Sequence, residues 1–170
     1  MYKIGRAKIY FVLLAAVFIH LTILDHARIA GVKPDIVLIC VAFFGLFLGP
    51  AAGSEAGLFA GLLEDIFSLN YFGINTFVLA LAGFFAGSLS TKFSRESKRS
   101  RFALVLLLGI CAMSLYFVLV SAFSKSLSLT FAEYFAHSIL PVSLYTSFVS
   151  VPIFLKFIGM YGLSDDQEYL

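Results

Sequence analysis

The sequence has little charge and no tryptophan, and the shortage of charge excludes an ordinary water-soluble domain. Charged residues make up 13% of the 170 positions, whereas 61% are hydrophobic and 20 are phenylalanine. A soluble domain carries about a quarter charged residues and roughly half apolar ones. The stretches between the apolar runs are also too short to form a soluble domain. The composition therefore predicts an integral membrane protein.

Cysteine is equally scarce. Cys40 and Cys111 are the two cysteines of the chain, and both lie inside apolar runs. Their spacing fits no metal-binding or redox motif, so we interpret both as buried packing thiols. The sequence also lacks a phosphate loop and a dinucleotide fingerprint. We therefore expect no cofactor and no nucleic-acid partner.

Patterns typical of metal sites and of serine hydrolases are missing too. His20 and His137 have no second ligand three or four positions away, and His26 lies in a predicted loop, so we expect no metal site. A hydrolase would require Ser54 as the nucleophile and His137 as its base. Ser54 lacks the strand-turn-helix surroundings of known serine nucleophiles. The prediction is a protein that is not an enzyme.

What the sequence contains instead is six apolar segments, which predict an all-α membrane protein with six transmembrane helices. They lie at about residues 9–24, 36–48, 51–67, 74–90, 102–123 and 134–158. Only Gly49-Pro50 separates the second from the third, and this predicts a tight helix hairpin because proline is tolerated at a helix start. Pro141 and Pro152 predict a kink in the sixth segment. No small-x-small cleavage site follows the first segment, so we interpret it as a span and not as a signal peptide.

The placement of Lys and Arg predicts the orientation in the membrane. If six spans alternate from a cytoplasmic N-terminus, nine basic residues lie inside and three outside. The inner nine are Lys3, Arg6, Lys8, Lys92, Arg95, Lys98, Arg99, Arg101 and Lys156, and the outer three are Arg28, Lys33 and Lys125. This asymmetry follows the positive-inside tendency, whereas five spans would put the basic loop 91–101 outside. We expect that loop, with Lys92, Arg95, Lys98, Arg99 and Arg101, to lie against anionic lipid or to contact a cytoplasmic partner.

Glycine is concentrated in the third segment. Gly49, Gly53, Gly57 and Gly61 follow one another at intervals of four, and the next interval of four ends at Asp65. Residues four apart lie on one side of a helix, so this spacing predicts a face without side chains that another helix can approach closely. We expect this face to form either the core of the protein itself or a socket for the transmembrane helix of a partner.

The fourth segment carries a matching pair of small residues, Gly83 and Gly87. Asp65 shares the glycine face of the third segment, and two roles remain open for its carboxylate. It can anchor a partner, or it can accept hydrogen bonds from the start of the fourth helix near Asn75, where backbone N–H groups are free.

Two other carboxylates lie in the third segment. Glu64 lies about 100° around the helix from the glycine face, and we expect it to be solvated near the membrane interface. Glu55 lies almost opposite the glycines. It either contacts another span or extends to the inner interface with its carboxylate in water.

The order of several short motifs resembles the rod shape-determining protein MreD family. In order they are Pro34-Asp35, an apolar span, Gly49-Pro50, the segment GLFAGLLEDI from Gly57 to Ile66, and the tetrapeptide FGIN from Phe72 to Asn75. The distinctive part covers residues 34–75, and the last two spans match in hydropathy alone. The short length and the basic loop after the fourth span also agree with that family.

The resemblance implies a non-enzymatic component of the bacterial cell-elongation machinery in the inner membrane. Members of that family work with the bitopic protein MreC. Together with MreC they are linked to the RodA glycosyltransferase, to its class B penicillin-binding transpeptidase and to cytoplasmic MreB filaments. The resemblance also implies a fold similar to the substrate-binding subunits of energy-coupling-factor transporters. The alternative functions are therefore vitamin capture by such a subunit, or a structural role in an unrelated membrane protein family.

Overall fold

Every regular element in the described part of the chain is helical. The computed structural model describes residues 5–22, 32–67, 71–91, 98–123 and 130–162. The helices are α1 (Arg6–Thr22), α2 (Ile36–Leu48), α3 (Pro50–Phe67), α4 (Ile74–Ser88), α5 (Lys98–Phe123), α6 (Phe131–Tyr134) and α7 (Leu140–Tyr161). A 3-10 turn (Leu89–Thr91) follows α4, and a π-helical segment (Phe135–Ile139) joins α6 to α7. The prediction of an all-helical fold is confirmed for these residues.

Two helical segments in the described residues are long and apolar enough to cross a membrane by themselves. They are Arg99–Phe123 and the continuous stretch Phe131–Tyr161. The helices α2 and α4 are apolar but shorter. This supports a membrane protein, while the number of six spans stays a prediction.

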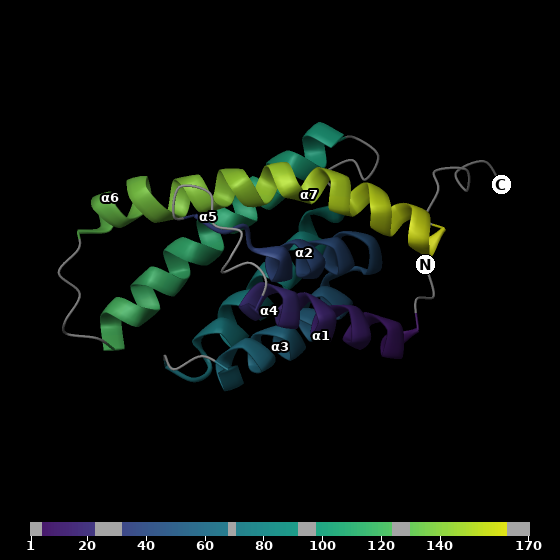
Figure 1. Ribbon diagram of the computed structural model, residues 1–170, viewed down its shortest axis with the longest axis horizontal. Helices are drawn as coiled ribbons and strands as arrows, with labels where there is room; N and C mark the ends of the chain where they lie inside the picture. Colours follow the sequence, from purple (N-terminus) through teal and green to yellow (C-terminus); the bar gives the residue numbers. More distant parts are fainter. Residues whose placement is uncertain (1–4, 23–31, 68–70, 92–97, 124–129, 163–170) are drawn as a thin grey trace.

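Helix α2 is the centre of the molecule. All of its residues from Val37 to Phe47 are buried, and it contacts α1, α3, α4, α5 and α7. In Figure 1, α5 and α7 lie together on one side of α2, and α1 and α3 lie on the other. A helix that is apolar on all sides has no face for water, so it takes the position that neighbouring helices enclose.

Helix α2 begins and ends at residues suited to those positions. The Asp35 carboxylate accepts a hydrogen bond from the Leu38 backbone N–H at 2.8 Å, which caps the first turn of α2. The backbone N–H of Asp35 donates to the Thr146 hydroxyl of α7 at 2.9 Å. Gly49 ends α2 with φ of +96°, and Pro50 begins α3 immediately afterwards. Glycine adopts that positive φ without strain, which permits the tight reversal between the two helices.

The C-terminal helix departs from regular α geometry before Pro141. Helix α7 continues as one helix through Pro152, and the π-helical segment Phe135–Ile139 lies directly before Pro141. Proline lacks the N–H that would bond to the carbonyl of residue 137, so a wider turn is accommodated there.

The two cysteines differ in burial. Cys40 of α2 is buried, whereas Cys111 of α5 is exposed. The interpretation of Cys111 as a buried packing thiol is therefore wrong. An apolar run does not reveal which side of a long helix faces its neighbours, and the side of α5 that carries Cys111 faces outward.

Candidate functional site

The glycine face of α3 lies directly against the backbone of α4. A Cβ atom added to Gly57 would lie 2.1 Å from the Leu79 carbonyl oxygen, and one added to Gly61 would lie 2.4 Å from the Thr76 Cα atom. At Gly53 the corresponding distance to the Gly83 carbonyl oxygen is 2.3 Å. Separations this short leave no space for any side chain. We call this contact between α3 and α4 the glycine seam.

Helix α4 contributes small residues to the same seam. A Cβ atom on Gly83 would lie 2.0 Å from the Gly53 carbonyl oxygen, and one on Gly87 would lie 2.3 Å from the Pro50 nitrogen. The predicted pair of glycines in the fourth segment therefore lies opposite the glycines of the third. Such close backbone approach is how helices pack where lipid replaces water and the hydrophobic drive between helices is absent.

Gly45 of α2 is a third contributor that sequence reasoning missed. Its Cβ atom would lie 2.6 Å from the Gly83 carbonyl oxygen and 2.8 Å from the Ala86 Cβ atom. Gly45 lies eight positions before Gly53, so the interval of four extends backward, but it is interrupted by the turn at Gly49. A Cβ atom on Gly49 would meet nothing within 4 Å. Gly49 thus serves the turn between α2 and α3.

Asp65 holds the start of α4. Its carboxylate accepts hydrogen bonds from the backbone N–H groups of Gly73 at 3.0 Å, Asn75 at 3.1 Å and Thr76 at 2.9 Å. The Thr76 hydroxyl donates to the same carboxylate. Asp65 is only 3% exposed. These bonds satisfy N–H groups that have no partner within their own helix, and the negative charge lies where the helix dipole is positive.

Glu55 contacts helix α1. Its carboxylate accepts a hydrogen bond from the Tyr10 hydroxyl, and it lies 3.9 Å from the Arg6 guanidinium nitrogen Nε. The Tyr10 ring also packs against Phe59 of α3, with ring centroids 4.7 Å apart. Of the two roles left open for Glu55, the structure places it in a contact between two helices.

Glu64 does not simply face solvent, which corrects the expectation of a solvated carboxylate. It is half-buried and lines a pocket of about 360 Å³. The imidazole of His20 and the carboxylate of Asp35 lie in the same pocket, and one ligand atom from each of the three side chains lies within 4.8 Å of the others. These residues are 15 and 29 positions apart in sequence, so a search for ligands three or four residues away could not find them.

The basic loop falls mostly outside the described residues. Lys92 and Arg95 lie outside them, and nothing is described of the Lys98 side chain. Arg99 is exposed, as expected for a residue that meets water or lipid headgroups. Arg101 is 5% exposed, so the expectation that it lies on the membrane surface is wrong. The first turn of α5 turns this residue inward against the other helices.

Comparison with known proteins gives one match. A model of the family described as rod shape-determining protein MreD matches residues 1–163 of the chain. No curated protein and no solved structure matches it. The predicted likeness to substrate-binding subunits of energy-coupling-factor transporters therefore gains no support, and neither does the vitamin-capture alternative.

Proposed function

Because this chain belongs to the MreD family of rod shape-determining proteins, we propose that it is a non-enzymatic inner-membrane component of the bacterial cell-elongation complex. The observation that carries the proposal is the family match, which covers 163 of 170 residues. The two long apolar helical segments, Arg99–Phe123 and Phe131–Tyr161, support placement in a membrane.

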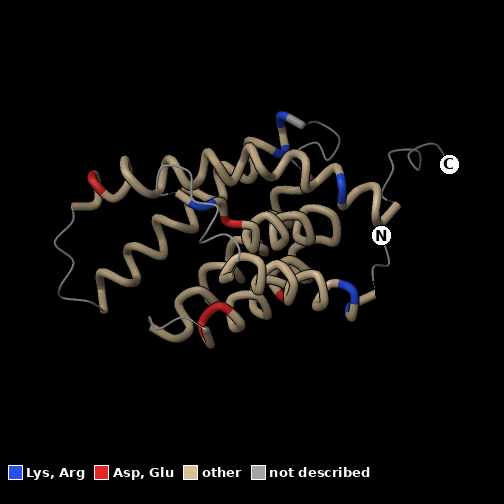
Figure 2. Tube along the Cα trace, in the orientation of Figure 1, with Lys and Arg blue, Asp and Glu red and all other residues tan. Residues whose placement is uncertain are grey.

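The distribution of charge supports a cytoplasmic N-terminus. In Figure 2 most of the described basic residues, at the start of α1, at the start of α5 and near the end of α7, lie toward the right half of the view, whereas a basic position just before α2 lies toward the left. Acidic residues near the end of α3 and in α6 lie toward the left. A bundle whose basic residues gather at one end inserts with that end in the cytoplasm. Both termini are cytoplasmic in this proposal.

The protein acts by binding partners, and the packing of its own core fixes the helices that form the binding surface. It binds MreC within the membrane, and through MreC it supports peptidoglycan synthesis by RodA and its class B penicillin-binding protein. MreB lies on the cytoplasmic side, next to the basic loop and membrane lipids. The glycine seam is filled by contacts within the chain. A partner helix therefore docks on an outer face, and the seam contributes indirectly by fixing α2, α3 and α4 relative to one another.

Depletion in a rod-shaped bacterial host tests the proposal. The gene is placed under a repressible promoter, and cell length and width are measured as the protein disappears. We expect the cells to become round, and a plasmid copy of the wild-type gene should restore rods. Continued growth as rods after the protein can no longer be detected would contradict the proposed function.

Co-purification tests the partner. The full chain carrying an affinity tag is extracted in mild detergent from cells that produce MreC at its natural level. We expect MreC to be recovered with it, whereas a tagged unrelated six-span protein recovers none. Equal recovery of MreC with both tagged proteins would contradict the proposed contact with MreC.

A further inference from the structure

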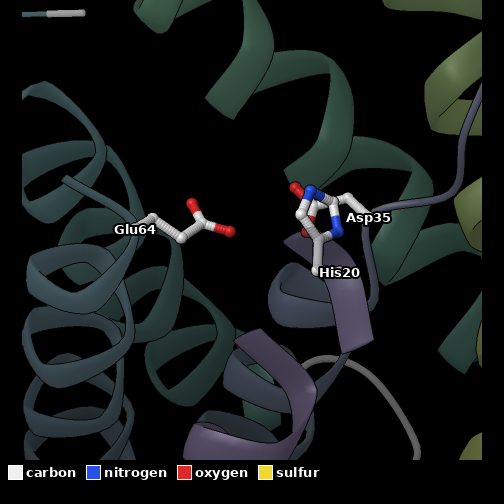
Figure 3. A group of neighbouring side chains, drawn as sticks. All are labelled: His20, Asp35 and Glu64. Atoms are coloured by element: carbon white, nitrogen blue, oxygen red, sulfur yellow. The ribbon is translucent and has the colours of Figure 1, made fainter. Parts of the chain in front are cut away.

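Three helices bring metal-binding side chains to one pocket. His20 lies near the end of α1, Asp35 is the residue that caps α2, and Glu64 is in the last turns of α3. Figure 3 shows the Glu64 carboxylate extending from its helix toward the imidazole of His20 and the carboxylate of Asp35. One ligand atom from each lies within 4.8 Å of the others. No residue of this group takes part in the glycine seam.

The charge of the pocket favours a cation. Asp35 and Glu64 bring two carboxyl groups to the pocket, and Lys33 is the only lysine or arginine among the described residues that line it. In the form that coordinates a metal, with His20 neutral and both carboxyl groups ionised, the formal sum is one negative charge. Asn75 and the hydroxyl-bearing Tyr116 and Tyr134 line the same space, so other polar residues share the pocket with the three candidate ligands.

We propose that His20, Asp35 and Glu64 bind a divalent first-row transition metal such as Zn²⁺. One imidazole nitrogen and two carboxylate oxygens form a mixed nitrogen and oxygen ligand set, which selects such metals over Mg²⁺ and Ca²⁺. Metal–ligand bonds of about 2.0–2.1 Å bring ligand atoms in a tetrahedral site to roughly 3.3 Å from one another. Rotation of the half-buried His20 and Glu64 side chains closes the remaining separation. Water fills the remaining coordination position within the pocket.

Asp35 is held in place before any metal arrives. One of its carboxylate oxygens, Oδ1, accepts the Leu38 backbone N–H at 2.8 Å, and its own N–H donates to Thr146. The second carboxylate oxygen is therefore presented from a fixed position. A metal bound there links α1, α2 and α3 at one end of the bundle, so its role is structural. This inference concerns metal binding alone and stands or falls independently of the proposed role in cell elongation.

Lys33 provides a second way to test the site. Its ammonium group lines the same pocket and repels a divalent cation that approaches the two carboxylates. Replacing it with glutamine removes that repulsion without removing a ligand. The Lys33→Gln variant should therefore bind metal more tightly than the wild-type protein, whereas loss of a ligand should weaken binding.

The experiment uses the full chain purified in detergent, stripped of metal with a chelator and titrated with Zn²⁺ by calorimetry. The variants are His20→Gln, Glu64→Gln and Lys33→Gln. Asp35 is left intact because its loss would also remove the cap of α2. Glu55→Gln is the matched control, since it removes a carboxylate from the same helix, α3, outside the pocket. Titration with Co²⁺, followed by its visible absorption, reports whether nitrogen and oxygen ligands surround the ion.

The proposal predicts one ion per chain, with affinity lowered at least about tenfold in His20→Gln and Glu64→Gln and unchanged in Glu55→Gln. Lys33→Gln should bind more tightly. Zn²⁺ should also raise the melting temperature of the wild-type protein, because the ion binds the folded state. Zn²⁺ binding that is equally strong in His20→Gln would overturn the site. The absence of saturable Zn²⁺ binding to the wild-type chain would do the same.

Discussion

Helices α3 and α4 pack through their backbones, whereas helices α5 and α7 pack through side chains. In the glycine seam the two backbones touch, and Cβ atoms at Gly57 or Gly83 would overlap backbone oxygen at 2.1 and 2.0 Å. Between α5 and α7, a Cβ atom on Gly109 would meet the Ser143 hydroxyl at 3.1 Å, which is a side chain that can move. The first contact is therefore rigid and the second is adjustable.

Helix α7 also buries several hydroxyl groups. Ser143, Ser147 and Ser150 of α7 are each at most 1% exposed. Ser147 donates to the Ser143 carbonyl oxygen at 2.7 Å, and Ser150 donates to the Ser147 carbonyl oxygen at 2.7 Å. The Ser147 and Ser150 hydroxyls are therefore satisfied within their own helix, whereas the buried Ser143 hydroxyl, which lies next to Gly109, has no hydrogen-bond partner among the described residues. The contact between α3 and α4 thus depends on the absence of side chains. The contact between α5 and α7 includes side chains, among them the Phe102 and Phe148 rings, whose centroids lie 5.1 Å apart.

The largest effect should come from adding one methyl group to the glycine seam. Gly83→Ala places a Cβ atom 2.0 Å from a backbone oxygen, so α3 and α4 must separate along their whole contact. We expect a loss of at least about 3 kcal/mol, because overpacking already costs 1–3 kcal/mol where side chains can adjust. Thermal unfolding in detergent measures it.

The control for that change is Gly159→Ala in α7. A Cβ atom there meets nothing within 4 Å, and alanine favours a helix over glycine by about 1 kcal/mol. The melting temperature should stay equal or rise. An equal loss of stability in both variants would show that the seam is not specially tight.

The second largest effect should come from the carboxylate that ends the seam. Asp65→Ala leaves the N–H groups of Gly73, Asn75 and Thr76 without their acceptor in a buried position. We expect destabilisation of about 2 kcal/mol, the upper end for loss of a helix cap. Unfolding of purified protein measures it. A melting temperature equal to that of the wild-type protein would contradict the role of Asp65 in holding α4.

A smaller effect should follow when the adjustable contact is altered. Gly109→Ala brings a Cβ atom to 3.1 Å from the Ser143 hydroxyl, which can rotate, and to 3.2 Å from the Ser143 Cβ atom, which cannot. We expect destabilisation of about 1 kcal/mol, the lower end for overpacking, because a small shift of α7 relieves the contact. If Gly109→Ala proves as damaging as Gly83→Ala in the same unfolding assay, the distinction between the two contacts disappears.

The smallest effect should come from the contact between α1 and α3. Tyr10→Phe removes the hydroxyl that donates to Glu55 and retains the ring that packs on Phe59. We expect a smaller loss of stability than for Gly109→Ala, because one hydrogen bond at a part-exposed site contributes little net free energy. Arg6→Gln should cost less, because its side chain is 80% exposed and such ion pairs contribute about 0–1 kcal/mol. The melting temperature of Arg6→Gln should therefore lie above that of Tyr10→Phe. The reverse order would contradict the larger role given to the Tyr10 hydroxyl.

The seam could be predicted in part because its signal is local. Glycines at intervals of four indicate a bare face on one helix, and Asp65 at the end of that face indicates a cap for the next helix. Local spacing could not show which helix fills the face. It also could not add Gly45, because the turn at Gly49 interrupts the helical register between α2 and α3.

The pocket could not be predicted because its members come from three separate helices. His20, Asp35 and Glu64 meet only when α1, α2 and α3 pack together, and no pattern within one helix records that meeting. The same limit explains the errors at Cys111 and Arg101. The burial of each depends on how α5 is rotated against its neighbours, and the nearly uniform apolar sequence of α5 does not specify that rotation.

The most direct measurement for the central claim, that the glycine seam is the protein's own core, is size-exclusion chromatography of the double variant Gly57→Leu, Gly61→Leu without MreC. Gly159→Leu, treated in the same way, controls for the added apolar volume. The account predicts that the double variant is aggregated or degraded while Gly159→Leu elutes as a single symmetrical peak. A double variant that elutes like the wild-type protein would contradict the account, because the glycine face would then be free to serve as a socket for a partner helix.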